Sequence, residues 1–162
     1  MQGIPLNERK RLGALLDDRP QTEVMAMIPQ FSQAETDNFV APPAQIPEAL
    51  GVLMFNMERG VNLPEIQEFL RDCPDIQPFD VILANELDDG CARSGNKNTA
   101  RELAQAFGLN YAWGLEFIEL VNDENAKGFH GNAVFSRWPI RRAGVIRLPE
   151  QYNWYFDRQK RI

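Results

Sequence analysis

Polar side chains collect at the ends of two short apolar runs, and their types are suited to metal-assisted chemistry. The run 52–55 ends in Asn56, and the run 81–84 ends in Asn85 and Glu86. Carboxylate and amide oxygens in such a cluster suit a hard cation such as Mg²⁺, which takes few protein ligands. The same letters occur wherever a strand passes into a turn, so a structural explanation stands beside the metal site.

Further acidic residues follow each run, and we weigh them less heavily. Glu58 lies two residues after Asn56, and Asp88-Asp89-Gly90 is an ordinary turn signal. Arg93 is close to these acids in sequence and is most simply their ion-pair partner. The segment Asp123–Asn125 has the composition of a surface loop.

His130, the single histidine, is expected in a glycine-flanked loop just before a strand. A lone loop histidine is ordinarily a hydrogen-bonded surface residue, but the neighbouring glycines indicate close approach of another backbone. Cys91 follows the acidic cluster, where negative charge disfavours its thiolate, so we do not expect it to act as a nucleophile.

The elements that must position these residues alternate between strands and helices. Buried-type strands are predicted at 52–55 and 81–84, each followed by a helix, the second of which begins with a capping box at Thr99–Glu102. Three more strands are expected near 111–117, 133–135 and 143–148. This order predicts an α/β fold with helices on one face of a sheet, and the buried-type strands require another layer on the other face.

Residues 1–48 are expected to form an N-terminal extension to the domain that starts at residue 49. The segment Asn7–Asp18 reads as a short helix, and the five prolines between residues 20 and 47 exclude a long helix there. We therefore predict a loop-rich lead-in with one short helix.

Composition narrows the function classes. The 162 residues carry 17 basic and 23 acidic side chains, a net charge of −6, which argues against duplex binding by bulk charge. Two cysteines are too few for a disulfide framework, and their spacing fits no structural zinc site. No apolar run is long enough to span a membrane, and no signal peptide is visible, so a cytoplasmic protein is expected.

Three segments together resemble the endonuclease/exonuclease/phosphatase superfamily. They are VLMFNMERG at 52–60, DVILANELD at 80–88 and GFHGNAVFSRWP at 128–139, in the family's order. The resemblance covers roughly residues 50–150. It departs from the family pattern at Phe55, where Trp is usual, and at Asn85, where Gln is common.

The resemblance implies a four-layer α/β/β/α sandwich, of which residues 49–162 would be the N-terminal half. Family members hydrolyse phosphate esters with Mg²⁺, or Mn²⁺ in its place. Carried over by position, Glu86 is the metal ligand and Asn56 orients the catalytic groups and the phosphate. Glu58 is a lesser candidate near the metal, whereas His130 and Asn132 face the site as in a bacterial subgroup. The substrate would be a small phosphodiester, a lipid head group or a nucleic acid.

The family's second half supplies a Gly-Asp-x-Asn motif and an Asp-His pair that this chain lacks. We therefore expect the activity in a longer parent protein and little activity from these residues alone. The alternative is a non-catalytic binding or scaffold domain that keeps the fold. An uncovered sheet face would also allow the chain to associate with itself.

Overall fold

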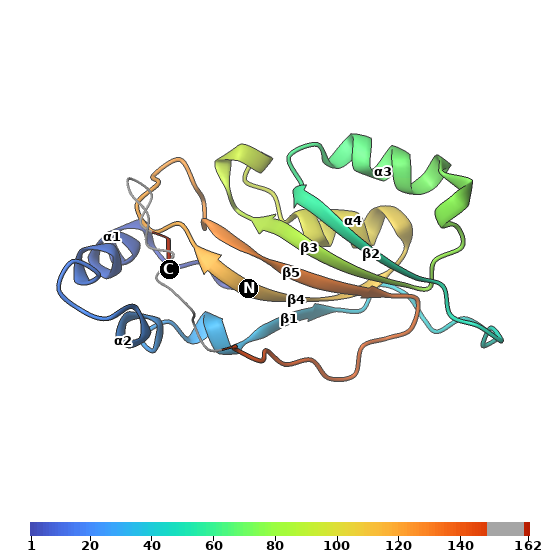
Figure 1. The fold of residues 1–162 in the computed structure, drawn as a ribbon, viewed down its shortest axis with the longest axis horizontal. Helices are drawn as coiled ribbons and strands as arrows, with labels where there is room; N and C mark the ends of the chain where they lie inside the picture. The colour runs from blue at the N-terminus through green and yellow to red at the C-terminus, as the bar shows by residue number, and fades with distance from the viewer. Residues whose placement is uncertain (149–160) are drawn as a thin grey trace.

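The computed structural model describes residues 1–148 and 161–162, and its core is one twisted five-stranded sheet (Figure 1). The strands are β1 (Ala34–Asp37), β2 (Val52–Arg59), β3 (Val81–Asp89), β4 (Asn110–Ile118) and β5 (Phe129–Ser136). The α-helices are α1 (Leu6–Leu15), α2 (Gln21–Met25), α3 (Leu63–Asp72) and α4 (Thr99–Phe107). Single 3₁₀ turns lie at Pro29–Ser32, Pro74–Ile76 and Ala92–Ser94.

The strand order is β1-β4-β5-β3-β2, and the sheet is mixed. Strands β2 and β3 are parallel, whereas β3–β5, β4–β5 and β1–β4 are antiparallel pairs. The predicted α/β class is therefore confirmed. Because β2 and β3 are parallel, their carboxyl ends meet at one edge of the sheet, beside the amino end of β5 and the carboxyl end of β4 (Figure 1).

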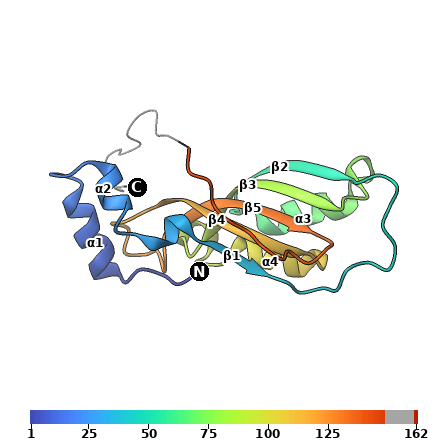
Figure 2. The same cartoon turned by 90° about the horizontal axis from the view of Figure 1, so that it is seen from below.

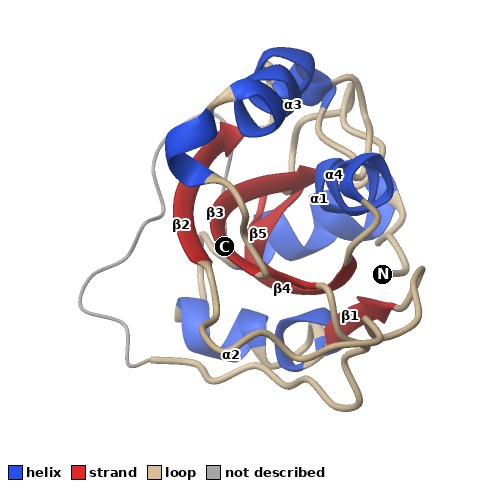
Figure 3. Cartoon of the chain, turned by 90° about the vertical axis from the view of Figure 1, so that its right-hand side faces the viewer, coloured by secondary structure: helices blue, strands red, loops and turns tan. Residues whose placement is uncertain are grey.

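Helices α3 and α4 cover one face of the sheet, as the sequence predicts (Figure 3). The N-cap of helix α4 lies one residue before Thr99, the N-cap that the predicted capping box required. Asn98 is the N-cap, and its side chain accepts a hydrogen bond of 2.8 Å from the backbone N–H of Arg101. The Thr99 hydroxyl instead donates to the carbonyl of Asp88 at 2.8 Å, which ties the helix to the end of β3.

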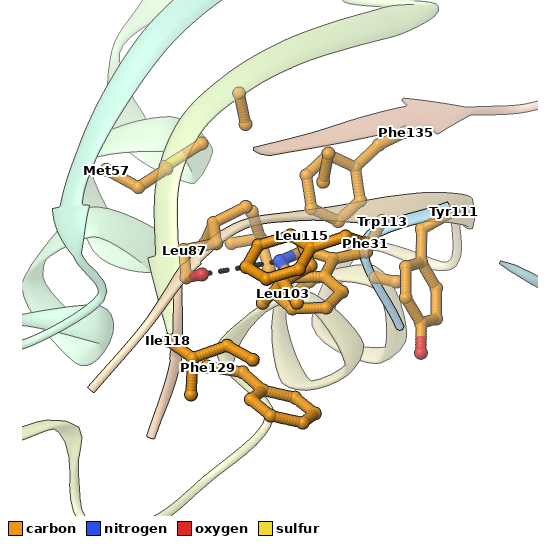
Figure 4. Packing of buried hydrophobic residues seen from close by; sticks show 14 of the residues in the cluster. Phe31, Met57, Leu87, Leu103, Tyr111, Trp113, Leu115, Ile118, Phe129 and Phe135 are labelled. Atoms are coloured by element: carbon orange, nitrogen blue, oxygen red, sulfur yellow. Dashed lines mark hydrogen bonds between the residues drawn. The ribbon is translucent and has the colours of Figure 1, made fainter. Parts of the chain in front are cut away.

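The hydrophobic core lies between the helices and the covered face of the sheet. Tyr111, Trp113 and Leu115 alternate along β4 and point into it, as a half-exposed strand predicts, and Leu103 meets them from α4 (Figure 4). The indole N–H of Trp113 donates to the carbonyl of Leu87 at 3.3 Å, so the largest core side chain is also satisfied as a donor.

The layer that the apolar sequences of β2 and β3 call for on the face away from the helices is not supplied by the described residues, so that face is left open. Val52 is 58% exposed, Met54 73% and Leu83 38%, and Val134 of β5 is 42% exposed on the same face. These four residues, which we call the open apolar face, lie opposite the helices. Continuous apolar strands ordinarily have both faces covered, so this face is unusual for its composition.

Residues 140–148 cross part of this side of the sheet over β4 (Figure 2). The strand that the sequence predicted at 143–148 does not form. Arg147 anchors the segment by donating to the carbonyls of Leu115 and Glu116. A groove of about 1370 Å³ remains between the segment and the sheet, with Leu83 and Val134 in its lining.

Residues 1–48, predicted as a loop-rich N-terminal extension, contribute side chains to the same hydrophobic core. Leu12, Val24 and Phe31 are buried within the single hydrophobic cluster. Strand β1 adds a fifth strand by pairing with β4, an element that the proline-rich composition did not reveal. The one predicted helix corresponds to α1, and α2 is a second, shorter helix.

Candidate functional site

The sequence-predicted site residues meet at the edge where β2 and β3 end. Asn56 lies near the end of β2, Glu86 near the end of β3, and His130 and Asn132 near the start of β5. Strand β4 brings Glu116 to the same edge, at the register shift between Leu115 and Phe117. Four neighbouring strands thus each contribute a polar side chain within a short distance.

Asn56 and Glu86 are in direct contact. The Asn56 amide Nδ2 donates to Glu86 Oε1 at 3.0 Å. The other end of the amide, Oδ1, accepts the backbone N–H of Glu58 at 2.8 Å, which closes a local turn and fixes the orientation of the side chain. Of the two groups of Asn56, one therefore holds the backbone and the other holds the carboxylate.

Both strands are irregular at this level. The β2–β3 register shifts between Asn56 and Arg59, and the β3–β5 register shifts between Ala84 and Leu87. Glu58 and Glu86 adopt left-handed backbone angles, with φ of 46° and 57°. Such angles cost a non-glycine residue of order 1–3 kcal/mol, and they concentrate at functional sites.

Asn132 connects Glu86 to Glu116. Its Oδ1 accepts the backbone N–H of Glu86 at 3.2 Å, and its Nδ2 lies 3.4 Å from Glu116 Oε2. The Glu116 side chain is 50% exposed, whereas Glu86 is of intermediate burial. The edge therefore presents two carboxylates joined by one amide.

His130 lies inside β5, in contrast to the loop that the sequence predicted, and its side chain is 3% exposed. Nδ1 lies 2.8 Å from Asp88 Oδ1, and Nε2 faces Glu116 Oε2 at 4.0 Å. The ring stacks on Phe117 with 4.3 Å between centroids. Asp88 and Phe117 thus fix both the rotation and the plane of the imidazole.

Asp88 is fully buried and belongs to a charged network behind His130. Arg93 donates to both of its oxygens, at 2.7 and 2.8 Å, and reaches Glu119 at 2.5 Å. Burial on its own would raise the pKa of Asp88, but hydrogen bonds from His130 and Arg93 outweigh it and hold the pKa below its usual range. The predicted role of Arg93 as an ion-pair partner is confirmed.

Two further predictions concern this network. Asn125 is buried, not part of a surface loop: its side chain donates to Glu119 at 2.9 Å and accepts the N–H of Ala92 at 2.8 Å. Cys91 is a buried free thiol, and burial together with the nearby Asp88 carboxylate raises its pKa. A thiol in that state is a poor nucleophile, as expected.

The glycines beside His130 do permit close backbone approach. A Cβ atom at Gly131 would lie 2.1 Å from the carbonyl oxygen of Gly114 and 2.8 Å from the Trp113 ring. Gly128 has φ of +75°, and a Cβ there would lie 2.6 Å from the Glu119 carbonyl oxygen. Both glycines are required by the packing of β5.

Among residues 1–148 and 161–162, no group of three or more His, Cys, Asp or Glu side chains is arranged to hold a metal ion. Glu86 still fits a partial Mg²⁺ site, because Mg²⁺ commonly uses one or two carboxylates and completes its shell with water and phosphate oxygens. Asn56 donates to Glu86 Oε1, and within those residues no hydrogen bond reaches the other oxygen, Oε2. Glu58 contributes its backbone N–H to the edge.

Sequence reasoning missed Glu116 and assigned no role to Asp88. The alternation along 111–117 did place Glu116 on the face opposite Trp113 and Leu115. A carboxylate near the end of an otherwise apolar strand was therefore the available signal. The pairing of Asp88 with His130 joins residues 42 positions apart and had no local signal.

Comparison with family models, curated proteins and solved structures gives no match for this chain. Among the described residues, no helix has the length and apolar character needed to cross a membrane.

Proposed function

We propose that this chain carries part of the active site of a Mg²⁺-dependent phosphate ester hydrolase, with Glu86 as metal ligand and Asn56 as orienting residue. The proposal follows the resemblance of three segments to the endonuclease/exonuclease/phosphatase superfamily. The proposed fold of the complete domain is the four-layer sandwich, in which this mixed sheet with α3 and α4 would be one sheet and its helix layer.

The contact between Asn56 and Glu86 is the observation that carries the proposal. The two residues come from different strands, 30 positions apart, and meet at 3.0 Å on two adjacent backbone irregularities. A turn after a strand explains one polar residue at a strand end. It does not explain an amide aimed at a carboxylate whose own backbone is in the left-handed region.

Each residue has a specific task in this hydrolase. Glu86 supplies negative charge through Oε2, and bound Mg²⁺ would act as a Lewis acid on the phosphoryl group. Asn56 holds Oε1 and thereby fixes the direction in which Oε2 points. His130, oriented by Asp88, holds a nitrogen toward the same edge. The described residues include no group that we assign to activating water.

We propose that the water-activating group belongs to a second half of the domain, in a longer protein. The open apolar face supports this, because Val52, Met54, Leu83 and Val134 lie where the sandwich would place its second sheet. Uncovered apolar patches of this kind mark interaction surfaces. The substrate would be a small phosphodiester, a lipid head group or a nucleic acid, and the −6 charge favours the first two.

Two measurements on Glu86→Gln test the function. In the 162-residue chain, Mg²⁺ should perturb the backbone NMR signals of residues 56–58 and 85–87, and the amide variant should abolish this because it removes the charge. In the longer protein, the same variant should abolish Mg²⁺-dependent hydrolysis of bis(p-nitrophenyl) phosphate. Glu68→Gln, an exposed change of equal charge on α3, is the matched control.

The metal assignment would be contradicted if Mg²⁺ shifted the backbone NMR signals equally in the wild type and Glu86→Gln, and if the two proteins had equal hydrolysis rates. A folded longer protein without any Mg²⁺-dependent hydrolysis would favour the alternative, a binding or scaffold domain that keeps this fold.

A further inference from the structure

His130 presents a nitrogen that has no hydrogen-bond partner among the described residues. Because Nδ1 faces the Asp88 carboxylate at 2.8 Å, it carries a proton, and Nε2 is the donor that the imidazolium form adds. The nearest acceptor to Nε2 is Glu116 Oε2 at 4.0 Å, beyond hydrogen-bonding distance. A side chain that is 97% buried thus directs an unused polar atom at the site edge.

Asn132 directs a second donor at the same place. Its Nδ2 lies 3.4 Å from the same oxygen of Glu116, at the long limit of a hydrogen bond. One carboxylate oxygen therefore faces two donors of β5 and binds neither closely. An anion is present where the donors point, but it fits them poorly.

The donors are fixed and the carboxylate is not. The His130 ring is held by Asp88 and by stacking on Phe117, and Asp88 is itself held by two hydrogen bonds from Arg93. The Asn132 amide is oriented by the backbone N–H of Glu86. Glu116, in contrast, has a half-exposed side chain, which can rotate into solvent at little cost.

Two arginines lie near the pair. Arg147 donates to the backbone carbonyl of Glu116, and the Arg161 guanidinium lies 5.2 Å from the centre of the Phe117 ring, on which His130 stacks. Both arginines are engaged by their own partners, and they raise the local potential without occupying the donors. Their charge partly offsets that of the nearby carboxylates, which favours an anion at this point.

We propose that His130 Nε2 and Asn132 Nδ2 bind an oxygen of a phosphate group, and that Glu116 covers this pair until the phosphate displaces it. The proposal deepens the function above and rests on it for the identity of the anion. It names a binding subsite next to Glu86 and gives Glu116 the role of an internal competitor. No bond is formed or broken at this subsite.

The test uses the ¹⁵N-labelled 162-residue chain with chelator present, titrated with inorganic phosphate and with dimethyl phosphate at constant ionic strength. The side-chain signals of His130 and Asn132 should shift and saturate. Glu116→Gln should bind phosphate roughly fivefold more tightly because it removes the competing charge.

Asn132→Asp is the second variant, because it removes the donor and keeps the oxygen that holds the Glu86 N–H. Since Asn132 is exposed, the fold should survive, and phosphate binding should weaken about tenfold or more. Glu102→Gln, which removes the same charge at a partly exposed position of α4, should leave binding unchanged.

Saturable shifts with either phosphate compound, strengthened in Glu116→Gln, would support the subsite. Shifts no larger than those caused by chloride, or equal binding by the wild type and Glu116→Gln, would overturn it. Glu86→Gln separates the two proposals, because it should abolish the Mg²⁺ response and keep the phosphate response in chelator. If the wild type shows no Mg²⁺ response, the proposed function has failed. If it shows no phosphate response, the proposed subsite has failed.

Discussion

Arg93 binds Asp88 through two parallel hydrogen bonds of 2.7 and 2.8 Å in the interior, directly behind the candidate site. The Asp88 side chain is fully buried and that of Arg93 is 25% exposed. The same guanidinium binds Glu119, which also pairs with Arg161, so Arg93 is a cation shared by two buried carboxylates. The network that orients His130 therefore also contributes to the stability of the fold.

Arg93→Met should destabilise the protein strongly, because it leaves the two carboxylates buried without their shared cation. Loss of one partner of a buried ion pair costs about 3–5 kcal/mol. Urea unfolding measures the change. Arg101→Met breaks the exposed pair with Asp37 and should cost no more than about 1 kcal/mol. Equal losses in the two variants would contradict the structural role of Arg93.

Acid should weaken the fold through Asp88. Its pKa is lower in the folded state than in the unfolded chain, so its contribution is fully present above the unfolded pKa of about 3.9 and is lost as the pH falls through the folded pKa. The unfolding free energy of the wild type should therefore fall below about pH 4. Asp88→Asn should be less stable at neutral pH and depend less on pH in that range; parallel curves would contradict the pairing.

Gly131→Ala should destabilise the β4–β5 pair. The added methyl group would meet the Gly114 carbonyl oxygen at 2.1 Å, and backbone cannot rotate away as a side chain can. A cost of about 1–3 kcal/mol is expected from overpacking. Gly144→Ala is the control, because nothing lies within 4 Å of the added atom. Thermal unfolding compares the two, and an unchanged Tm for Gly131→Ala would refute the close approach.

The 162-residue chain should associate through its open apolar face. Met54 is 73% exposed and Leu83 38%, and β2 is an edge strand that also offers unpaired backbone groups. The double variant Met54→Asp, Leu83→Asp should shift the chain toward monomer in multi-angle light scattering. Ile46→Asp, at an exposed loop position, should not. A wild-type monomer with a sharp thermal transition would show that this face needs no cover.

Asn56→Ala should lower kcat of the longer protein more than it raises KM, because an orienting amide acts mainly in the transition state. Steady-state kinetics at saturating Mg²⁺ separate the two parameters. A change confined to KM would make Asn56 a substrate-binding residue.

The sequence by itself determined the elements whose signals are local. The alternation along 111–117, the apolar runs at 52–55 and 81–84, and the helix predicted after each run all depend on neighbours in the chain. The strand ends also located Asn56 and Glu86, because parallel strands separated by a helix must end at the same edge. Their direct hydrogen bond agrees with that expectation.

Only the tertiary structure decided the features that depend on distant partners. Strand β1 exists because β4 offers a free edge to a segment of weak propensity, so composition at 34–37 could not reveal it. Asp88 and Asn125 read as turn and loop residues until Arg93, His130 and Glu119 surround them. Burial and charge pairing are properties of residues far apart in the chain, and local sequence patterns do not record them.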